Sequence, residues 1–222
     1  TSSAMVVGLI NCINKYKGLN LSHMEIIKDA YKIERKICNS YGGWQDQIIS
    51  QYGNLLDIKI SKKEVINVKK IPLNKKINNV IKNNFLLVYT DIKRNSSEVI
   101  LSQKKSSRDI KKYYDKLKLL NKPILDSIKK ANLNLIGNLF NKHWELKKNL
   151  SKKITDKKIN NFYDELHTKY NILGGKLIGA GGGGFFLVCT KNKKKLGKFL
   201  RENNLNYINL KIEKKGSHIL NI

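Results

Sequence analysis

Several residue types that identify common protein classes are scarce in this chain. It has only three cysteines, Cys12, Cys38 and Cys189, at wide spacings and without a CxxC pair. This pattern argues against a disulfide framework or a zinc site, and it favours a reducing, cytoplasmic compartment. No apolar run reaches the roughly 18 residues that a membrane-spanning helix requires, so we expect no membrane partner. The opening segment lacks a basic leader and is not predicted to be a signal peptide.

Arginine is also scarce, although the chain is strongly basic. The 222 residues include 44 Lys+Arg against 17 Asp+Glu, and only Arg35, Arg94, Arg108 and Arg201 are arginines. Nucleic-acid recognition favours arginine, whose forked side chain binds phosphates and bases, so we expect no nucleic-acid partner. A non-catalytic basic nucleic-acid-binding protein stays open as the alternative from a different class. Anionic small substrates are compatible with the charge.

The apolar periodicity predicts an α+β protein. Helical patterns cover residues 1–17 and 22–38, with Gly18 after the first and Ser22 as the cap of the second. Residues 54–71 alternate like two short strands, residues 72–84 are predicted to form a polar linker, and residues 85–90 a buried strand. The period is helical from residue 96 to residue 170, with breaks near Pro123, Asn132 and Ser151. The remainder predicts a strand, a glycine loop, a second strand, a short helix and closing strand material.

The second helical segment contains a carboxylate on its apolar side. At 100° per residue, Glu34 falls near the middle of the arc that Ile27, Ala30 and Ile37 occupy. A carboxylate in this position is costly unless it is paired or bound to a cation. Two interpretations stay open: a salt bridge to a lysine elsewhere, or a metal ligand at the base of a site.

The stretch GGWQDQ, residues 42–47, supplies a second carboxylate. Asp46 follows a double-glycine turn and lies between Gln45 and Gln47. An ordinary turn explains the glycines and the acid but does not require Trp44, so a turn and a pocket wall are both left open.

Three hydroxyl residues, Thr1, Ser2 and Ser3, begin the first helical segment, whose body is apolar. The open N–H groups at such a helix start favour phosphate binding. Simple capping explains the hydroxyls equally well.

Residues 174–189 read GGKLIGAGGGGFFLVC, with four consecutive glycines, Gly181 to Gly184, between apolar segments. Glycine weakens a strand interior but permits positive φ and a close approach of the backbone to a neighbour. A flexible linker does not explain the apolar flanks, whereas a nucleotide-phosphate site uses such a loop. Neither the dinucleotide GxGxxG placement nor the P-loop pattern fits this stretch.

Together these segments resemble the GHMP small-molecule kinases. GGKLIGAGGGGFFLV is similar to the third motif of that family, and TSSA at residues 1–4 resembles the end of its second motif. The pattern ER…GGWQDQ…YG resembles the sugar-kinase branch that contains the heptose 7-phosphate kinases and the fucokinase domain, and LLVYTDIKRNSSEVI, HWELKKNLS and the closing GSHI look like the heptose phosphate members. The resemblance implies the GHMP kinase two-domain fold. Residues 1–80 would belong to the N-terminal, ATP-binding domain, and residues 81–222 would form a ferredoxin-like C-terminal domain.

The resemblance also implies a chemistry. It implies an ATP-dependent, Mg²⁺-using kinase that phosphorylates the anomeric hydroxyl of D-glycero-D-manno-heptose 7-phosphate to the 1,7-bisphosphate, for surface-polysaccharide precursors. A fucokinase-like kinase of another sugar is the rival. The partner is then a small-molecule sugar phosphate, and a homodimer is left open.

By the same resemblance, individual residues match the roles of the family. Asp46 matches the catalytic aspartate, and Ser2 and Glu34 match ligands of Mg²⁺. The nucleotide-binding set comprises Thr1, Ser2, Ser3, Gly179, Gly181, Gly182 and Gly183. Trp44, Gln45, Arg94 and Lys176 are predicted on the substrate side, with Arg94 as the fork for a second phosphate.

The sequence departs from the family pattern in two ways. The first motif and the glycines that would precede Thr1 are absent, so we expect the chain to represent part of an enzyme without turnover by itself. Asn54 and Asp91 stand where the resemblance leads us to expect glycine. Both residue types tolerate positive φ better than most.

Overall fold

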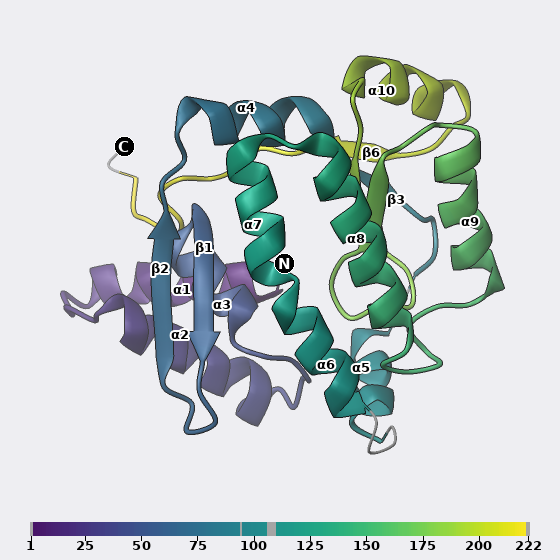
Figure 1. The fold of residues 1–222 in the computed structure, drawn as a ribbon. Helices are drawn as coiled ribbons and strands as arrows, with labels where there is room; N and C mark the ends of the chain where they lie inside the picture. Colours follow the sequence, from purple (N-terminus) through teal and green to yellow (C-terminus); the bar gives the residue numbers. More distant parts are fainter. Residues whose placement is uncertain (1, 94, 106–109, 221–222) are drawn as a thin grey trace. The chain divides into compact units, whose positions relative to one another are not determined.

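The computed structural model describes residues 2–93, 95–105 and 110–220, which form two units by their internal contacts (Figure 1). Unit 1 comprises Thr1–Leu73 and Ile212–Ile222, and unit 2 comprises Asn74–Lys211. The contact boundary therefore lies ahead of residue 80, and the closing residues join the first unit. The division at residue 80 as the border between the two domains of the family stays a prediction.

Unit 1 consists of a small helical cluster and one hairpin. Its elements are α1 (Ser2–Tyr16), α2 (His23–Lys32), the π-helical turn η1 (Ile33–Ile37), α3 (Gln45–Tyr52), β1 (Leu55–Ile60) and β2 (Ile66–Ile71). Ser22 caps α2 and forms a capping box with Glu25, as the sequence indicated for this helix start. Buried Val7 of α1 packs against Ile26 and Ala30 of α2.

The hairpin and the closing segment complete unit 1. Strands β1 and β2 are antiparallel, with Leu55 opposite Ile71. The closing segment pairs with the end of α3, where Asn54 N donates to Glu213 O and Ser217 N donates to Ser50 O at 2.8 Å. Both Asn54 (φ 68°) and Asp91 (φ 55°) have the positive φ that their glycine-like positions indicated.

Unit 2 is built on one antiparallel sheet with the strand order β4-β5-β3-β6. Its elements are α4 (Lys75–Asn84), β3 (Phe85–Tyr89), α5 (Ser96–Lys104), α6 (Ile110–Leu119), α7 (Asn121–Lys130), α8 (Leu133–Lys148), α9 (Lys157–Thr168), β4 (Gly174–Leu177), β5 (Phe185–Cys189), α10 (Lys193–Glu202) and β6 (Tyr207–Asn209). The first and third strands are central, and the second and fourth lie at the edges. This is the split βαββαβ order, so the predicted ferredoxin-like topology is confirmed.

The core of unit 2 lies on one face of this sheet. Leu86 and Val88 of β3 stand opposite Val188 and Phe186 of β5, and all four side chains are fully buried. The indole of Trp144 on α8 meets Phe186 edge-on at 5.3 Å between ring centroids. Alternate residues of each strand therefore supply the sheet half of the core, as a period of two requires.

Two local expectations differ from the structure, and a third is confirmed. The expected linker at residues 72–84 is mostly the helix α4, because Asn74 caps it and Ile77, Val80 and Ile81 bury one helical face. The break expected near Pro123 is present, because α6 ends at Leu119 and α7 begins at Asn121, with Pro123 in the first turn of α7, where proline costs no helical hydrogen bond. The closing strand material is limited to β6, since the following residues pair with unit 1.

Candidate functional site

Glu34 lies in the π-helical turn that follows α2. The N–H of Cys38 donates to Ile33 O at 2.9 Å, which is the i to i+5 spacing of a π-turn rather than the i to i+4 spacing of an α-helix. Ser40 N also returns to Glu34 O at 2.9 Å. The Glu34 side chain is only 3% exposed. π-turns inside helices occur frequently at functional sites.

The partners of Glu34 are hydroxyl and amide groups. Ser2 Oγ donates to Glu34 Oε1 at 2.8 Å, and Gln47 Nε2 donates to Glu34 Oε2 at 2.5 Å. Gln47 Nε2 also lies 3.3 Å from the buried Ser3 Oγ. Among the described residues, no lysine, arginine or histidine forms an ion pair with Glu34. The salt-bridge interpretation therefore receives no support from that part of the chain.

The carboxyl group is held in its charged form. Burial alone would raise the pKa of Glu34. Hydrogen bonds from Ser3, Ser2 and Gln47 oppose that effect, and the positive charge of Arg35 adds to them. Together they bring the pKa below its ordinary value. A buried anion without a cationic partner is a favourable position for a bound cation.

The donor atoms around Glu34 suit a hard divalent cation. Mg²⁺ prefers oxygen ligands and is often held by one or two carboxylates. Glu34 and Ser2 offer such oxygens, and Gln47 Oε1 is buried without a hydrogen-bond partner among the described residues. Within the described ranges, no three His, Cys, Asp or Glu side chains cluster as they would around zinc. The residues present therefore fit Mg²⁺.

Asp46 lies in the first turn of α3, directly before Gln47. Its side chain is exposed, whereas that of Gln47 is fully buried. The first turn of α3 therefore places the carboxylate of Asp46 toward solvent and the amide of Gln47 against Glu34. Trp44 precedes this helix and stacks on Tyr31, with ring centroids 3.5 Å apart and planes 4° apart. One face of the indole is thereby covered, and Gln45 beside it is exposed.

Arg35 packs against the double-glycine turn before Trp44, and sequence reasoning did not single it out. Its guanidinium donates to Gly43 O at 3.3 Å and to Ser40 Oγ at 3.3 Å. A Cβ on Gly42 would lie 2.6 Å from Arg35 Nη2. An α-helical wheel places Arg35 on the polar arc, and the π-turn changes this register. The clue in the sequence is the ER pair followed by GG.

The glycine loop between β4 and β5 is held in conformations that glycine favours. Gly181 (φ 109°) and Gly183 (φ 130°) both have positive φ. A Cβ on Gly183 would lie 2.4 Å from Ile92 O, and one on Gly181 would lie 3.0 Å from Ile154 Cα. The close approach expected at these glycines is therefore made to Ile92 and Ile154 of the same unit. Ile154 lies in a bend between α8 and α9.

Two models of one protein family match this chain. The model described as GHMP kinases N terminal domain matches residues 1–54, and the model described as GHMP kinases C terminal matches residues 124–209. The chain belongs to the GHMP kinase family. The first match covers Ser2, Glu34 and Asp46, and the second covers Lys176 and the glycine loop. The family resemblance seen in the sequence is thereby confirmed.

Curated relatives place this GHMP kinase chain near sugar kinases. It is 29% identical over 210 residues to the D-glycero-alpha-D-manno-heptose 7-phosphate kinase of Campylobacter jejuni, which covers 90% of this chain and 60% of the relative. It is 27% identical over 212 residues to the L-fucokinase/L-fucose-1-P guanylyltransferase of Bacteroides fragilis, which covers 91% of this chain and 22% of that protein. The chain thus spans 60% of the length of the first relative and less of the second.

Solved structures share the fold. A D-glycero-D-manno-heptose 1-phosphate kinase from Bacteroides thetaiotaomicron aligns with a TM-score of 0.71 at 20% identity, covering 100% of this chain and 63% of that one. A sugar kinase from Campylobacter jejuni, described as putative, aligns with a TM-score of 0.72 at 24% identity, covering 97% of this chain and 62% of that one. The mevalonate kinase of Methanococcus jannaschii aligns with a TM-score of 0.66 at 25% identity, covering 91% of this chain and 60% of that one. The predicted GHMP kinase fold is therefore confirmed.

Of the other predicted residues of this GHMP kinase chain, Lys176 lies in unit 2, close to His143. Lys176 on β4 is largely buried, its Nζ lies 5.8 Å from the centroid of the Phe140 ring, and burial lowers its pKa. Burial and the charges of Lys176 and Lys147 lower the pKa of His143 to about 3, so its imidazole is neutral at physiological pH. Thr1 and Arg94 lie outside the described residues.

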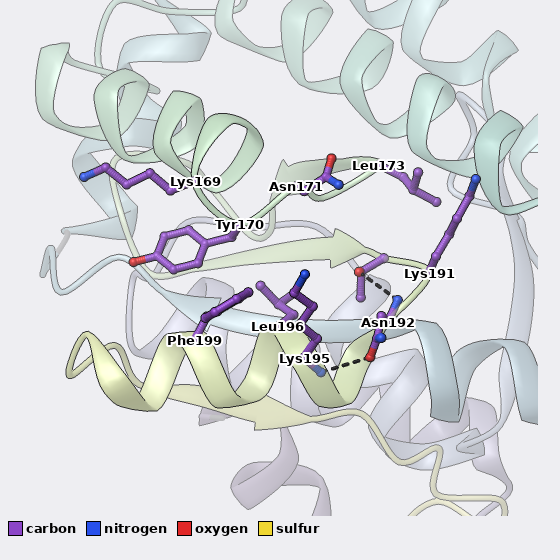
Figure 2. A pocket seen from close by; sticks show the side chains of 10 residues that line it. Lys169, Tyr170, Asn171, Leu173, Lys191, Asn192, Lys195, Leu196 and Phe199 are labelled. Atoms are coloured by element: carbon purple, nitrogen blue, oxygen red, sulfur yellow. Dashed lines mark hydrogen bonds between the residues drawn. The ribbon is translucent and has the colours of Figure 1, made fainter.

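Unit 2 of the GHMP kinase chain also contains a pocket of about 370 Å³ at the far end of the β4–β5 hairpin from the glycine loop. Figure 2 shows Tyr170 and Phe199 beside it, with Asn192 Oδ1 accepting a hydrogen bond from Lys195 N. The lining residues are Lys169, Tyr170, Asn171, Leu173, Thr190, Lys191, Asn192, Lys195, Leu196 and Phe199. None of the predicted site residues lines this pocket. In the described part of the chain, no helix combines the length and apolar character needed to cross a bilayer.

Proposed function

We propose that this chain contributes the acceptor-activating and metal-binding residues of a sugar kinase. The reaction is transfer of the γ-phosphoryl group of ATP to the anomeric hydroxyl of D-glycero-D-manno-heptose 7-phosphate, which gives the 1,7-bisphosphate. The observation that carries the proposal is the buried, charged Glu34, bonded by Ser2 and Gln47 without a described ion-pair partner. The relative from Campylobacter jejuni supports the choice of sugar.

Glu34 and Ser2 are the residues that would hold Mg²⁺. When bound, Mg²⁺ neutralises charge on phosphate oxygens, which phosphoryl transfer requires. Gln47 fixes the Glu34 carboxylate through Oε2, and Ser3 packs beside the Gln47 amide. The first turn of α1 additionally offers backbone N–H groups, so its start favours a phosphate as well as a cation ligand.

Asp46 is the residue that would act on the acceptor. Its exposed carboxylate can accept the hydrogen of the sugar hydroxyl and orient the oxygen for attack. Because Gln47 ties the start of α3 to Glu34, the carboxylate of Asp46 is held in a fixed relation to the metal ligand. Positioning of this kind supplies most of the catalysis in phosphoryl transfer.

The substrate side is assigned to four residues. Trp44 and Gln45 precede Asp46 on the chain and would contact the sugar ring. Arg94 would be the fork for the second phosphate, and Lys176 would lie on the substrate side of the glycine loop. Gly179, Gly181, Gly182 and Gly183 would form the loop that approaches the phosphates, with Thr1, Ser2 and Ser3 at the helix start.

The rival substrate is an unphosphorylated sugar such as fucose, favoured by the 27% identity to the Bacteroides fragilis protein. A kinase of this type would not need a second-phosphate site. Turnover of fucose without a sugar phosphate would therefore identify a fucokinase-like enzyme. The proposed roles of Asp46 and Glu34 would be unchanged.

The deciding experiment is ADP release with Mg·ATP, measured for this chain and in parallel for the full open reading frame that encodes it. D-glycero-D-manno-heptose 7-phosphate is compared with fucose, mannose and no sugar. From the full open reading frame we expect turnover only with the heptose phosphate and its loss in Asp46→Asn, whereas we expect no turnover from this chain by itself. Asp29→Asn is the matched control, because Asp29 is an exposed acid of α2 in the same unit. If no sugar raises ADP release by the full open reading frame above its Asp46→Asn background, the kinase proposal fails.

A further inference from the structure

The pocket in unit 2 is lined by none of the residues assigned to the kinase site (Figure 2). Its volume of about 370 Å³ is within the range of small-molecule sites. Its walls come from the connection between α9 and β4, the connection between β5 and α10, and the first two turns of α10. All of these segments belong to unit 2, so one compact unit forms the pocket.

Hydrogen bonds fix both connections that form the walls. Leu173 N donates to Cys189 O at 2.8 Å, which joins the two connections where the hairpin begins and ends. Thr190 N donates to Asn84 O at 2.9 Å, and Asn84 Nδ2 donates to Thr190 O at 2.9 Å. Thr190 Oγ1 accepts from Asn192 N at 3.2 Å. The walls are therefore held in place before a ligand binds, as is usual for small-molecule sites.

The buried side of the pocket is mainly apolar. Leu196 is 2% exposed and Tyr170 is 9% exposed. The partly buried ring of Phe199 lies beside the pocket with Tyr170 (Figure 2). An aromatic or apolar group that binds against these side chains is removed from water, which favours binding.

The exposed side of the pocket is cationic. Lys169, Lys191 and Lys195 line it, and no Asp or Glu is among its described lining residues. Lys195 Nζ lies 5.4 Å from the centroid of the Phe199 ring, so the ammonium is close to the aromatic side. Within the described ranges, neither Lys191 nor Lys195 forms an ion pair. Lys169 pairs with Glu165 at 3.1 Å, but both side chains are exposed, and such a pair contributes little.

A phosphate monoester matches this combination of charges better than a carboxylate does. It carries about 1.5–2 negative charges at neutral pH, whereas a carboxylate carries one. Two ammonium groups without a described acidic partner, Lys191 and Lys195, can therefore both be compensated by one phosphate. The start of α10, which Asn192 caps, adds the positive end of the helix dipole to the same wall.

We propose that this pocket is a second ligand site, which binds a phosphate monoester with an aromatic or apolar body. Lys191 and Lys195 contact the phosphate, and Leu196 and Phe199 contact the body. The site uses none of the residues assigned to the kinase reaction. It therefore does not rest on the proposed function, and the two can fail independently.

The first test is calorimetric titration of the product of the full open reading frame with AMP in the absence of divalent cations. Adenosine and inorganic phosphate are titrated separately, because they represent the body and the charge of AMP. We expect AMP to bind about tenfold or more tightly than either, since both sides of the pocket then contribute. Its affinity should fall as NaCl is added. Absence of AMP binding at millimolar concentration would overturn the proposal.

Charge variants of the pocket show whether AMP binds there. Lys191→Gln and Lys195→Gln are each expected to weaken AMP binding by about fivefold, as for the loss of an exposed ion pair. Lys198→Gln is the matched control, since Lys198 is an exposed lysine of α10 that pairs with Glu202 at 3.7 Å and does not line the pocket. Wild-type affinity in the Lys191→Gln, Lys195→Gln double variant would overturn the proposal. An equal loss in Lys198→Gln would do so too, because it would show an effect of net charge alone.

The second test locates AMP by amide resonances in nuclear magnetic resonance spectra. We expect AMP to shift the resonances of residues 170–173 and 190–196, in wild type and equally in the proposed kinase-inactive variant Asp46→Asn. Shifts confined to the glycine loop, residues 179–184, would place AMP at the proposed kinase site and overturn the second site. Phe199→Leu should weaken AMP binding but not inorganic phosphate binding, and unchanged AMP binding would exclude the contact with the aromatic ring.

Discussion

Ser2 and Glu34 stand 32 positions apart in the chain, and the Ser2 hydroxyl donates to the Glu34 carboxylate at 2.8 Å. This bond joins the first turn of α1 to the π-turn after α2. With Gln47 it occupies both oxygens of a buried carboxylate, without a described ion-pair partner. The Glu34 carboxylate is therefore buried, charged and hydrogen-bonded by the neutral groups of Ser2 and Gln47. A bound cation would compensate its charge.

Gln47→Leu tests the orientation of Glu34. Removing the amide leaves Glu34 Oε2 buried without its 2.5 Å donor, so we expect unfolding free energy to fall by about 1–3 kcal/mol. Groups that orient metal ligands typically contribute about 10–100-fold in affinity, so Mn²⁺ binding should weaken by that factor. Denaturant unfolding and Mn²⁺ electron paramagnetic resonance measure the two effects. Gln45→Leu, on the exposed neighbouring residue, should keep wild-type Mn²⁺ affinity, and equal Mn²⁺ affinity in Gln47→Leu would contradict the assignment.

Gly183→Ala tests the close approach of the glycine loop. The new Cβ would lie 2.4 Å from Ile92 O at a φ of 130°, so both a steric clash and backbone strain oppose it. We expect a loss of about 1–3 kcal/mol in unfolding free energy, measured by urea denaturation. Gly8→Ala is the matched control. Apart from its own stretch of α1, no described atom lies within 4 Å of the added Cβ, and the change should stabilise the fold by about 0.5–1 kcal/mol.

Arg35→Lys tests the brace of the double-glycine turn. A lysine ammonium cannot replace the fork that reaches Ser40 Oγ and Gly43 O at 3.3 Å each. We expect faster amide exchange across residues 40–44 and a fall in kcat, because Asp46 follows this turn. Lys36→Met changes the exposed neighbouring residue and should leave both readouts at the wild-type level. Amide exchange across residues 40–44 that stays as slow in Arg35→Lys as in wild type would show that the guanidinium does not stabilise the double-glycine turn.

His143 predicts a pH dependence of stability. Burial, Lys176 and Lys147 lower its pKa to about 3, so the folded state keeps the imidazole neutral where the unfolded state binds a proton. The neutral imidazole therefore contributes to folding stability. That contribution is fully present above the unfolded-state pKa of about 6.5, and it is lost as pH falls from that value toward 3. We expect His143→Gln to lose less stability than wild type between pH 7 and pH 5 in urea titrations. His218→Gln, at an exposed histidine, is the control, and parallel acid profiles of His143→Gln and wild type would contradict the prediction.

The elements that the sequence predicted well are those with a local cause. Ser22 caps α2 through a bond to a residue three positions away, and the alternating residues of β3 and β5 form one face of a core. Positive φ at Asn54 and Asp91 follows from the tolerance of those side chains. By contrast, the sequence does not predict α4, because its three buried apolar residues stand among polar ones and its Asn74 cap is also typical of a linker.

The sequence by itself determined that Glu34 is a carboxylate among apolar residues, that Asp46 follows a double glycine, and that the four-glycine run lies between two apolar segments. These are patterns of period, spacing and residue type, which a single chain displays directly. Only the tertiary structure decided that Gln47 binds Glu34, that Arg35 occupies the space left by Gly42, and that Lys147 holds Gly179. The physical reason is that each contact joins residues from different elements, and the i to i+5 register of the π-turn depends on hydrogen bonds that residue propensities do not distinguish from α-helical ones.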